Sequence, residues 1–308
     1  MALGTVSVRV PATAANLGPA FDCMGLALNL YTTVSLARSA EFALDIRGYG
    51  ADQLSRGADN LVYRSVCSVY KRLGERPPAL RLRCRNTIPI YRGLGSSAAA
   101  VVGGLVAANA LEGRRLSQAE LLDMALRIEG HPDNVAPALL GGCQIALAEN
   151  GKVTTSGVPI RRGLRGVIFV PDVEVPTKEA RRLLSPTIAR GDAVFNVGRA
   201  ALLVLALSQG RWDLLPVATQ DRLHQAPRRT LFPAMDALFQ AAREAGADGV
   251  FLSGAGPTVL AMTTGDPTPV GKAMAEAAGH RGIGGFWKRV ALGGRGAHVV
   301  KGSESTWR

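Results

Sequence analysis

PIYRGLGSSAAA, residues 89–100, places two glycines and two serines directly before an apolar segment that continues to Leu111. Glycine allows backbone angles that side chains forbid, and a serine hydroxyl accepts hydrogen bonds from the first-turn amides of a helix. The pattern therefore predicts a tight loop, a cap made by Ser96 and Ser97, and a buried helix over Ala98–Leu111. Because the free amides and the dipole of a helix N-terminus attract anions, the loop is a candidate phosphate site, which we interpret as a site for a nucleotide. A plain helix start is the alternative that this stretch alone leaves open.

The whole chain has 308 residues and a formal net charge of +12, with 36 basic and 24 acidic side chains. Its length fits one large domain or two smaller ones with sizeable cores. Aromatic residues make up only 5% of the chain, and its basic residues form no long run, which disfavours a nucleic-acid partner. A generally basic protein that commits some arginines to an anionic ligand is the simpler interpretation.

Cysteine usage and apolar runs indicate the compartment. The four cysteines, Cys23, Cys67, Cys84 and Cys143, have the spacing of neither a zinc site nor a disulfide framework, so we expect a reduced, cytoplasmic interior. The N-terminus alternates like a strand and lacks the pattern of a signal peptide. Residues 93–111 carry no charge but include polar and small residues, so we expect a core helix and no membrane partner.

The first polar motif is PATAANLGPAFDCMGLAL, residues 11–28, which follows an alternating strand over Gly4–Val10. Turn-forming residues interrupt it, and Asp22 then lies in an apolar context. Because an unpaired buried carboxylate is costly, Asp22 is expected to have either a partner in the protein or a ligand cation. Satisfaction by neighbouring turn amides is the alternative.

Periodicity predicts further elements along the chain. Strands are expected over Leu26–Leu36, Glu41–Tyr49, Leu80–Arg85, Gly141–Glu149 and Val167–Val170, and helices over Asn60–Leu73, Ser117–Leu126, Ala193–Ser208, Leu231–Ala245 and Pro269–Ala278. The segment between the strands that end at Glu149 and begin at Val167 is expected to be a turn region. GVFLSGAGPTVL, residues 249–260, predicts two strands joined by a loop of small residues. Two closing strands should follow the last helix.

Three other clusters carry polar chemistry. EGHPDN, residues 129–134, gathers oxygen ligands that suit Mg²⁺ beside a phosphate loop, although the same residues can form a plain turn before a helix. Thr177 and Arg181 are four residues apart and share one helix face. Arg228 and Arg229 could clamp a carboxylate bidentately, with ordinary surface roles as the alternative.

Taken together, these motifs resemble a known family. Their order and spacing are similar to the homoserine kinase family of the galactokinase–homoserine kinase–mevalonate kinase–phosphomevalonate kinase superfamily, over nearly the whole chain. The motifs that carry the resemblance are Pro11–Leu28, Pro89–Ala99, Glu129–Gly142, Thr177–Arg181 and Leu252–Leu260. Neither the GxxxxGK[ST] motif of P-loop enzymes nor the motif set of protein kinases is present.

The resemblance implies an α+β, two-lobed small-molecule kinase fold with the active site between the lobes. Residues 1–160 would form a ribosomal-protein-S5-like, ATP-binding half that carries the phosphate loop. Residues 161–308 would form a ferredoxin-like half on the substrate side. The implied reaction (EC 2.7.1.39) is the ATP-dependent phosphorylation of the side-chain hydroxyl of L-homoserine to O-phospho-L-homoserine, a step towards threonine, with ATP and Mg²⁺ and with a homodimer as the family expectation.

Roles transfer to matching residues as implications of the resemblance. The phosphate-binding residues would be Pro89, Ile90, Tyr91, Arg92, Gly93, Leu94, Gly95, Ser96, Ser97, Ala98 and Ala99. The substrate-binding residues would be Asn16, Asp22, His131, Asn134, Thr177, Arg181 and Arg228, with Asn134 and Arg181 as the catalytic pair. Ser96 and Glu129 would hold the metal, with Asp123 in reserve because some relatives carry this glutamate further from the Asn134 position. Ser253, Gly254 and Gly256 would support the phosphate loop.

One departure from other members of the superfamily bears on mechanism. Mevalonate- and galactokinase-like relatives carry an Asp at the Asn134 position and a basic residue near positions 12–14, and this chain has neither. The departure favours a homoserine kinase and argues against a carboxylate base, since the adjacent Asp133 does not align with that base. We therefore expect direct attack by a hydroxyl that Asn134 positions. Another small-molecule kinase of the mevalonate or sugar type, and a non-enzymatic binding protein on the same fold, are the alternatives.

Overall fold

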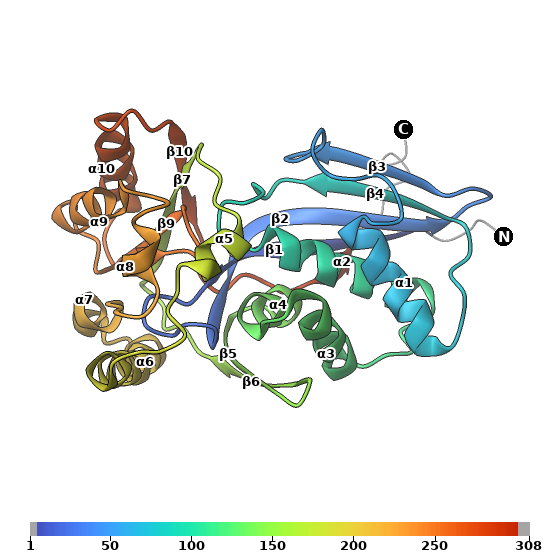
Figure 1. Ribbon diagram of the computed structural model, residues 1–308, viewed down its shortest axis with the longest axis horizontal. Helices are drawn as coiled ribbons and strands as arrows, with labels where there is room; N and C mark the ends of the chain where they lie inside the picture. The colour runs from blue at the N-terminus through green and yellow to red at the C-terminus, as the bar shows by residue number, and fades with distance from the viewer. Residues whose placement is uncertain (1–4, 301–308) are drawn as a thin grey trace.

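A computed structural model describes residues 5–300 and shows two β-sheets, each covered by helices (Figure 1). The first sheet contains seven strands within this range: β1 (Val6–Ala15), β2 (Met24–Arg38), β3 (Ala43–Gly48), β4 (Leu80–Asn86), β5 (Cys143–Glu149), β6 (Lys152–Val158) and β11 (His298–Val300). The second contains four: β7 (Arg165–Pro171), β8 (Gly249–Leu252), β9 (Val259–Thr263) and β10 (Gly285–Val290). The predicted two-lobed α+β fold is confirmed.

The long strand β2 organises the first sheet, whose main order is β11-β1-β2-β4-β3. It pairs with β1 along most of its length, with β4 through its later residues, and with β5 through its first residues; β5 in turn pairs with β6. The register of β1 against β2 shifts between Pro11 and Thr13. Proline has no amide to donate to a neighbouring strand, and a bulge re-aims the side chains that follow it. The irregularity therefore lies directly before Thr13, which takes part in the site described below.

Helices cover one face of the first sheet (Figure 1). They are α1 (Leu61–Leu73), α2 (Ser96–Leu111), α3 (Gln118–Glu129) and α4 (Pro132–Leu140). Ten residues of α2 are buried, because this apolar helix packs against the strands on one side and against α1 and α3 on the others. The predicted core helix is therefore confirmed.

The second sheet has its own helices and its own core. The elements that follow β7 are α5 (Thr177–Arg182), α6 (Arg190–Gln209), η1 (Trp212–Leu214), α7 (Leu215–Ala218), α8 (Gln225–Arg228), α9 (Met235–Glu244) and α10 (Pro267–Gly279). Side chains of α9 and α10, among them Leu238 and Met274, form a buried cluster with Phe169 of β7. The short helix α5 lies between the two halves (Figure 1). It is thereby placed to carry side chains into the space where the halves meet.

Among the helices of residues 5–300, one, α6, is long and apolar enough to cross a membrane, judged by length and composition only. Much of it is uncovered, and Val194 and Val197 are 67% and 71% exposed. One such helix is weak evidence of a membrane span.

The structure corrects several local predictions. Ser96 and Ser97 do not cap α2: the helix begins at Ser96, and its N-cap is Gly95, which has φ +65° and makes no side-chain cap. The expected turn region contains β6, which the pattern missed because most of its side chains are polar or exposed. The helix expected over Leu231–Ala245 begins only at Met235, because Pro233 disfavours helical angles in the residue before it.

The predictions for the first strand and for the two closing strands are confirmed in part. Gly4, where the first predicted strand begins, lies outside the described residues, and β1 continues beyond the predicted end to Ala15. Two closing strands are present, but each joins a different sheet: β10 pairs with β7 and β11 pairs with β1. The first sheet is therefore completed by residues from the far end of the chain.

The two halves meet where the glycine loop approaches the β8–β9 turn. The hydroxyl of Ser253 donates a hydrogen bond of 2.6 Å to the carbonyl of Gly93. Gly93 has φ +72°, and a Cβ atom there would lie 2.2 Å from the carbonyl oxygen of Ser253 and 2.7 Å from that of Gly256. Only glycine fits this position, on grounds of both angle and space.

We expect Gly93→Ala to lower the free energy of unfolding by about 3 kcal/mol, as the sum of backbone strain and overpacking. Gly113→Ala is the matched control, because Gly113 has φ +77° but nothing within 4 Å of a built Cβ. That control should lose only about 1–2 kcal/mol of conformational strain. Urea unfolding of the ligand-free proteins measures both values, and equal losses would contradict the packing argument.

Candidate active site

The loop between β4 and α2 holds its backbone against the first strand. Leu94 accepts a hydrogen bond of 3.0 Å from the amide of Thr13. The side chains of Leu94, Ala98 and Ala99 are buried, so these predicted phosphate residues can offer a ligand only backbone groups. Ser96 is partly exposed and Ser97 is exposed at the first turn of α2. The arrangement matches an anion site at a helix N-terminus.

A carboxylate lies beside this helix start. Glu129, the last residue of α3, accepts a hydrogen bond of 2.5 Å from the hydroxyl of Ser97. Burial raises the pKa of Glu129, and the bond from Ser97 partly opposes that shift. The reserve candidate, Asp123, instead accepts a bond of 2.9 Å from the amide of Val153 on β6. Of the two predicted acidic ligands, Glu129 is the one that contacts the phosphate loop.

Asn134 lies at the start of α4, and its amide has a defined orientation. Its Oδ1 accepts a hydrogen bond of 2.7 Å from the hydroxyl of Thr13, and its Nδ2 donates one of 3.3 Å to Oδ1 of Asp133. The same carboxylate oxygen lies 3.3 Å from Nδ1 of His131. The nearby carboxylate of Asp133 raises the pKa of His131, against the effect of burial. The amide NH₂ of Asn134 therefore faces a negatively charged, largely buried neighbour.

Asp22 pairs with Arg181 across the two halves. The guanidinium of Arg181, on α5, donates to both carboxylate oxygens of Asp22, at 2.6 and 2.9 Å. The side chains are 32% and 34% exposed, so the pair remains open to solvent on one side. Hydrogen bonding to Asp22 raises the pKa of Arg181. Two predicted substrate residues are therefore each other's partners in the ligand-free chain.

Arg228 is a deeply buried cation held by two acceptors. It is 2% exposed, and its Nη1 donates to the carbonyl of Gly254 at 2.9 Å and to Nδ1 of His224 at 2.7 Å. Since Nδ1 accepts, the proton of the neutral imidazole lies on Nε2, which donates to the carbonyl of Gly18 at 2.7 Å. Burial lowers the pKa of Arg228 to about 10 and that of His224 to about 4. Arg228 thus stays charged and His224 stays neutral at neutral pH.

The two arginines converge on one aromatic ring. The guanidinium carbons of Arg181 and Arg228 lie 5.6 and 5.8 Å from the centre of the Phe21 ring, which also stacks on His224 at 5.2 Å. The Nε–H group of each arginine is buried and has no hydrogen-bond partner among residues 5–300. A buried donor without a partner is costly, so each of these groups is suited to an anionic ligand.

The other predicted residues have mixed surroundings. Asn16 is 3% exposed, and its side chain donates to the carbonyl of Gly254 and accepts from the amide of Asp22, both at 2.9 Å. It therefore links the first motif to the β8–β9 turn. Thr177 is exposed at the beginning of α5. Ser253 and Gly256 contact Gly93, in agreement with their predicted place beside the phosphate loop.

Sequence reasoning missed several residues that hold the site together: Thr13, Phe21, Asn196, Asp221 and His224. Asp221 accepts hydrogen bonds from the amides of Leu223, His224 and Gln225 and from the side chain of Asn196. The sequence held a local signal for two of these residues. Asp221 could be recognised as a turn former that accepts from the amides two to four residues later. His224 precedes Arg228 by four residues, which places both on one helix face. Nothing local pointed to Thr13 or Asn196.

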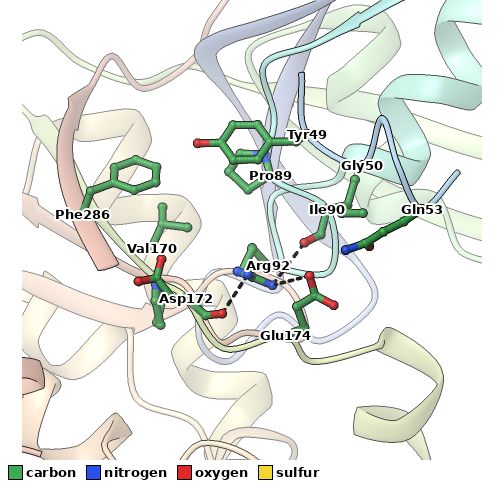
Figure 2. A pocket seen from close by; sticks show the side chains of 11 residues that line it. Tyr49, Gly50, Gln53, Pro89, Ile90, Arg92, Val170, Asp172, Glu174 and Phe286 are labelled. Carbon is green, nitrogen blue, oxygen red and sulfur yellow. Dashed lines mark hydrogen bonds and ion pairs between the residues drawn. The ribbon is translucent and has the colours of Figure 1, made fainter. Parts of the chain in front are cut away.

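A cavity of about 200 Å³ opens on the other side of the glycine loop (Figure 2). Its lining includes Tyr49, Phe286 and the side chain of Arg92. The guanidinium of Arg92 donates to the carbonyl of Asp172 at 2.8 Å and lies 3.2 Å from the carboxylate of Glu174. The sequence position of Arg92 implied a contact with phosphate. In the structure its guanidinium contacts Asp172 and Glu174, in the segment that follows β7.

Comparisons with known proteins agree with this geometry. The models of the GHMP kinases N terminal domain and the GHMP kinases C terminal domain match residues 60–142 and 203–280. The chain is 43% identical over 293 residues to a homoserine kinase from Moorella thermoacetica, which covers 95% of this chain and 99% of the relative. A homoserine kinase from Desulfitobacterium hafniense is 41% identical, and the alignment covers 96% of this chain and 100% of that relative. The crystal structure of homoserine kinase from Cytophaga hutchinsonii aligns with a TM-score of 0.89 at 30% identity, covering 97% and 98% of the two chains.

The buried imidazole generates a prediction about pH. An unfolded chain protonates His224 below about pH 6.5, whereas the folded chain resists protonation down to a pKa of about 4. The wild-type protein should therefore lose stability as the pH falls between these values. His224→Gln removes this dependence, so the stability difference between wild type and variant should shrink by about 2 kcal/mol from pH 7 to pH 4.5. Urea titrations at both pH values test this, and a difference that stays constant would contradict it.

Proposed function

As the chain belongs to the GHMP kinase family, among the homoserine kinases, we propose that it transfers the terminal phosphoryl group of ATP to the side-chain hydroxyl of L-homoserine. The product would be O-phospho-L-homoserine, an intermediate on the way to threonine. Identity above 40% over nearly the full length of its relatives supports the substrate. The four cysteines form no disulfide, which supports the cytoplasmic location expected from the sequence.

The observation that carries the proposal is the pair of arginines above Phe21. Arg181 and Arg228 each retain a buried Nε–H group without a partner, and both lie close to that ring. A carboxylate is the ligand that such donors recognise most strongly. Asp22 is paired with one of these arginines and offers the negative charge that an ammonium group needs. A zwitterionic amino acid meets both requirements, whereas neutral sugars meet neither.

The Asp22–Arg181 pair also balances two of the charges in the pocket. Each side chain neutralises the other, so neither needs a ligand for the chain to fold. A bound zwitterion would present the same two charges in opposite order, with its ammonium near Asp22 and its carboxylate near Arg181. Binding would therefore add charge-assisted hydrogen bonds without leaving an unpaired charge behind.

The nucleotide would place its phosphates on the glycine loop and the first turn of α2. Gly93 allows the loop backbone to lie close to the β8–β9 turn, and Gly95 allows it to lie close to Thr13. The amide of Thr13 also donates a hydrogen bond to the carbonyl of Leu94. Free amides at a helix start and the helix dipole favour the phosphate charge.

Oxygen donors at this helix start fit a magnesium ion. Glu129 supplies a buried carboxylate and Ser97 a hydroxyl 2.5 Å away, and these are the hard ligands that Mg²⁺ takes together with phosphate oxygens and water. Within residues 5–300, no three His, Cys, Asp or Glu side chains form a metal cage, which is the usual situation for such a site. The sequence named Ser96 as the serine ligand, but the contact of Ser97 with Glu129 favours Ser97. When bound, Mg²⁺ would neutralise phosphate charge.

Asn134 would align the reacting hydroxyl and not act as a base. Thr13 occupies its Oδ1, so its NH₂ group remains the part that can donate to an oxygen. An amide cannot take up a proton at neutral pH, and alignment is sufficient where the transition state of phosphoryl transfer is loose. His131 lies 3.3 Å from the same carboxylate oxygen of Asp133 that accepts from Asn134, so it is a further polar side chain beside the reacting hydroxyl in this proposal.

A coupled ADP-release assay with Mg-ATP tests the proposal on L-homoserine, L-threonine, L-serine, mevalonate and galactose. Turnover on L-homoserine should far exceed that on the others. Faster turnover on mevalonate or galactose would establish the runner-up, another kinase of the same superfamily. No ADP release with any of them would leave only the nucleotide site standing.

Arg181→Gln should reduce kcat/KM for L-homoserine by about 10- to 100-fold, because a charge-assisted hydrogen bond contributes about 1.5–3 kcal/mol. The KM for ATP should change by less than about twofold, since Arg181 contacts no part of the glycine loop. Arg182→Gln is the matched control, because Arg182 is its exposed neighbour on α5. An unchanged KM for L-homoserine in the Arg181 variant would remove the arginine from the substrate site.

Asn134→Asp should lower kcat by roughly tenfold or more, because the new carboxylate would face Asp133, which now accepts from the NH₂ group at 3.3 Å. Thr13→Ser keeps the hydroxyl that orients Asn134 and should stay close to wild type. Steady-state kinetics with L-homoserine measure both. A more active Asp enzyme would show that a carboxylate base is useful here and would overturn the alignment mechanism.

A further inference from the structure

We infer that Arg92 is a positioning residue that couples the phosphate loop to α5, and so links nucleotide binding to substrate binding; the inference rests on the proposed function. Arg92 belongs to the glycine loop by sequence, but its guanidinium contacts the segment between β7 and α5 (Figure 2). Its side chain is only 15% exposed. The guanidinium contacts the carbonyl of Ile90 on its own loop only at 3.5 Å, and its shorter contacts, to Asp172 and Glu174, lie on the other half of the protein. A cation this covered therefore holds the two segments together.

Two contacts of different kinds make this link. The charged contact joins Arg92 to the carboxylate of Glu174 at 3.2 Å, and because Glu174 is 42% exposed, that ion pair alone adds little. The second contact holds the backbone of this segment in place. The guanidinium donates a hydrogen bond of 2.8 Å to the carbonyl of Asp172, so a shift of the segment would break this bond.

The backbone beside Arg92 strengthens the connection. The carbonyl of Tyr91 accepts a hydrogen bond of 2.9 Å from the amide of Val175, and the amide of Thr258 donates to the carbonyl of Arg92 at 3.3 Å. Tyr91 has φ +53°, a left-handed conformation that bulky residues rarely adopt. A residue held in such a conformation depends on its surroundings, so the loop keeps this shape only while the 172–175 segment stays in place.

From this segment the link continues directly to the substrate arginine. The side chain of Val175 packs with Ala180 of α5 and Ala255 of the β8–β9 turn. α5 begins two residues after Val175 and carries Arg181, which pairs with Asp22. A ligand that orders the phosphate loop therefore also orders the helix that presents Arg181, and coupling of this kind is reciprocal.

Direct phosphate binding by Arg92 is the competing role, and the two roles differ in what they change. A phosphate ligand contributes to nucleotide affinity alone. A positioning residue contributes to the effect of one ligand on the affinity for the other, with smaller effects on either ligand alone.

Calorimetric titration of L-homoserine, with and without a saturating non-hydrolysable ATP analogue and Mg²⁺, measures that effect. In wild type the nucleotide should tighten L-homoserine binding by about fivefold or more. Arg92→Gln should reduce this ratio to less than about twofold while the affinity for the nucleotide alone changes by less than about threefold. Arg92→Lys, which keeps the charge but loses the planar fork, should recover part of the ratio.

Arg72→Gln is the matched control, since Arg72 forms an ion pair of similar length with Glu120 far from both loops. It should leave the ratio unchanged. A full ratio in Arg92→Gln, or a wild-type ratio of one, overturns the inference. Loss of nucleotide affinity by more than about tenfold with the ratio intact would assign Arg92 to the phosphates instead.

Hydrogen exchange on the wild-type protein keeps the test independent of variant folding and of the substrate. Adding the nucleotide analogue and Mg²⁺ should slow amide exchange over residues 172–182, and unchanged exchange there overturns the inference. If L-homoserine fails to bind wild type at all, the proposed function fails, and the exchange measurement still decides whether the loop and α5 are linked.

Discussion

The arrangement of the whole site depends on the close approach between Gly93 and the β8–β9 turn. No side chain fits between them, and the hydroxyl of Ser253 bonds the Gly93 carbonyl across the contact. The neighbouring carbonyl of Gly254 accepts from both Asn16 and Arg228. One turn therefore fixes the phosphate loop, the first motif and the buried arginine at the same time. Because these segments come from distant parts of the chain, their mutual positions follow from this contact more than from any one element.

The charges of the site are compensated within the protein at two levels of burial. Asp22 and Arg181 form a half-exposed ion pair. Arg228 is buried, and no carboxylate of the described residues lies at hydrogen-bond distance from it. A carbonyl and the lone pair of a neutral imidazole accept its hydrogen bonds. Burying a cation in this way costs free energy, as its lowered pKa shows, yet that pKa of about 10 keeps it charged at neutral pH. Arg228 thus contributes a positive charge to the pocket, and its Nε–H group is available to donate to an anion.

Much of the fold was predictable because it is encoded locally. The strands and helices that periodicity predicted are present, and the motifs Pro11–Leu28, Pro89–Ala99 and Leu252–Leu260 contact one another where the halves meet. The errors have local physical causes: Gly95 in a left-handed conformation replaced the serine cap, and the polar strand β6 lacks an apolar rhythm. The supporting residues of the site were less predictable, because the bond from Thr13 to Asn134 spans 121 positions and that from Asn196 to Asp221 spans 25. Arg92 shows the limit most clearly, since a motif gives the position of a residue in the loop but not the direction in which its side chain points.

Strand β11 gives the protein an unusual order of assembly during its synthesis. The edge of the first sheet beside β1 is closed by His298–Val300, almost the last residues of the described chain. A ribosome adds about 5–20 residues per second, so β1 stays uncovered for roughly a quarter of a minute to a minute after it emerges. During that time its outer backbone groups are open to pairing with another nascent chain. A truncated product that stops before β11 would keep this exposed edge permanently, which makes incomplete translation a direct route to aggregation for this protein.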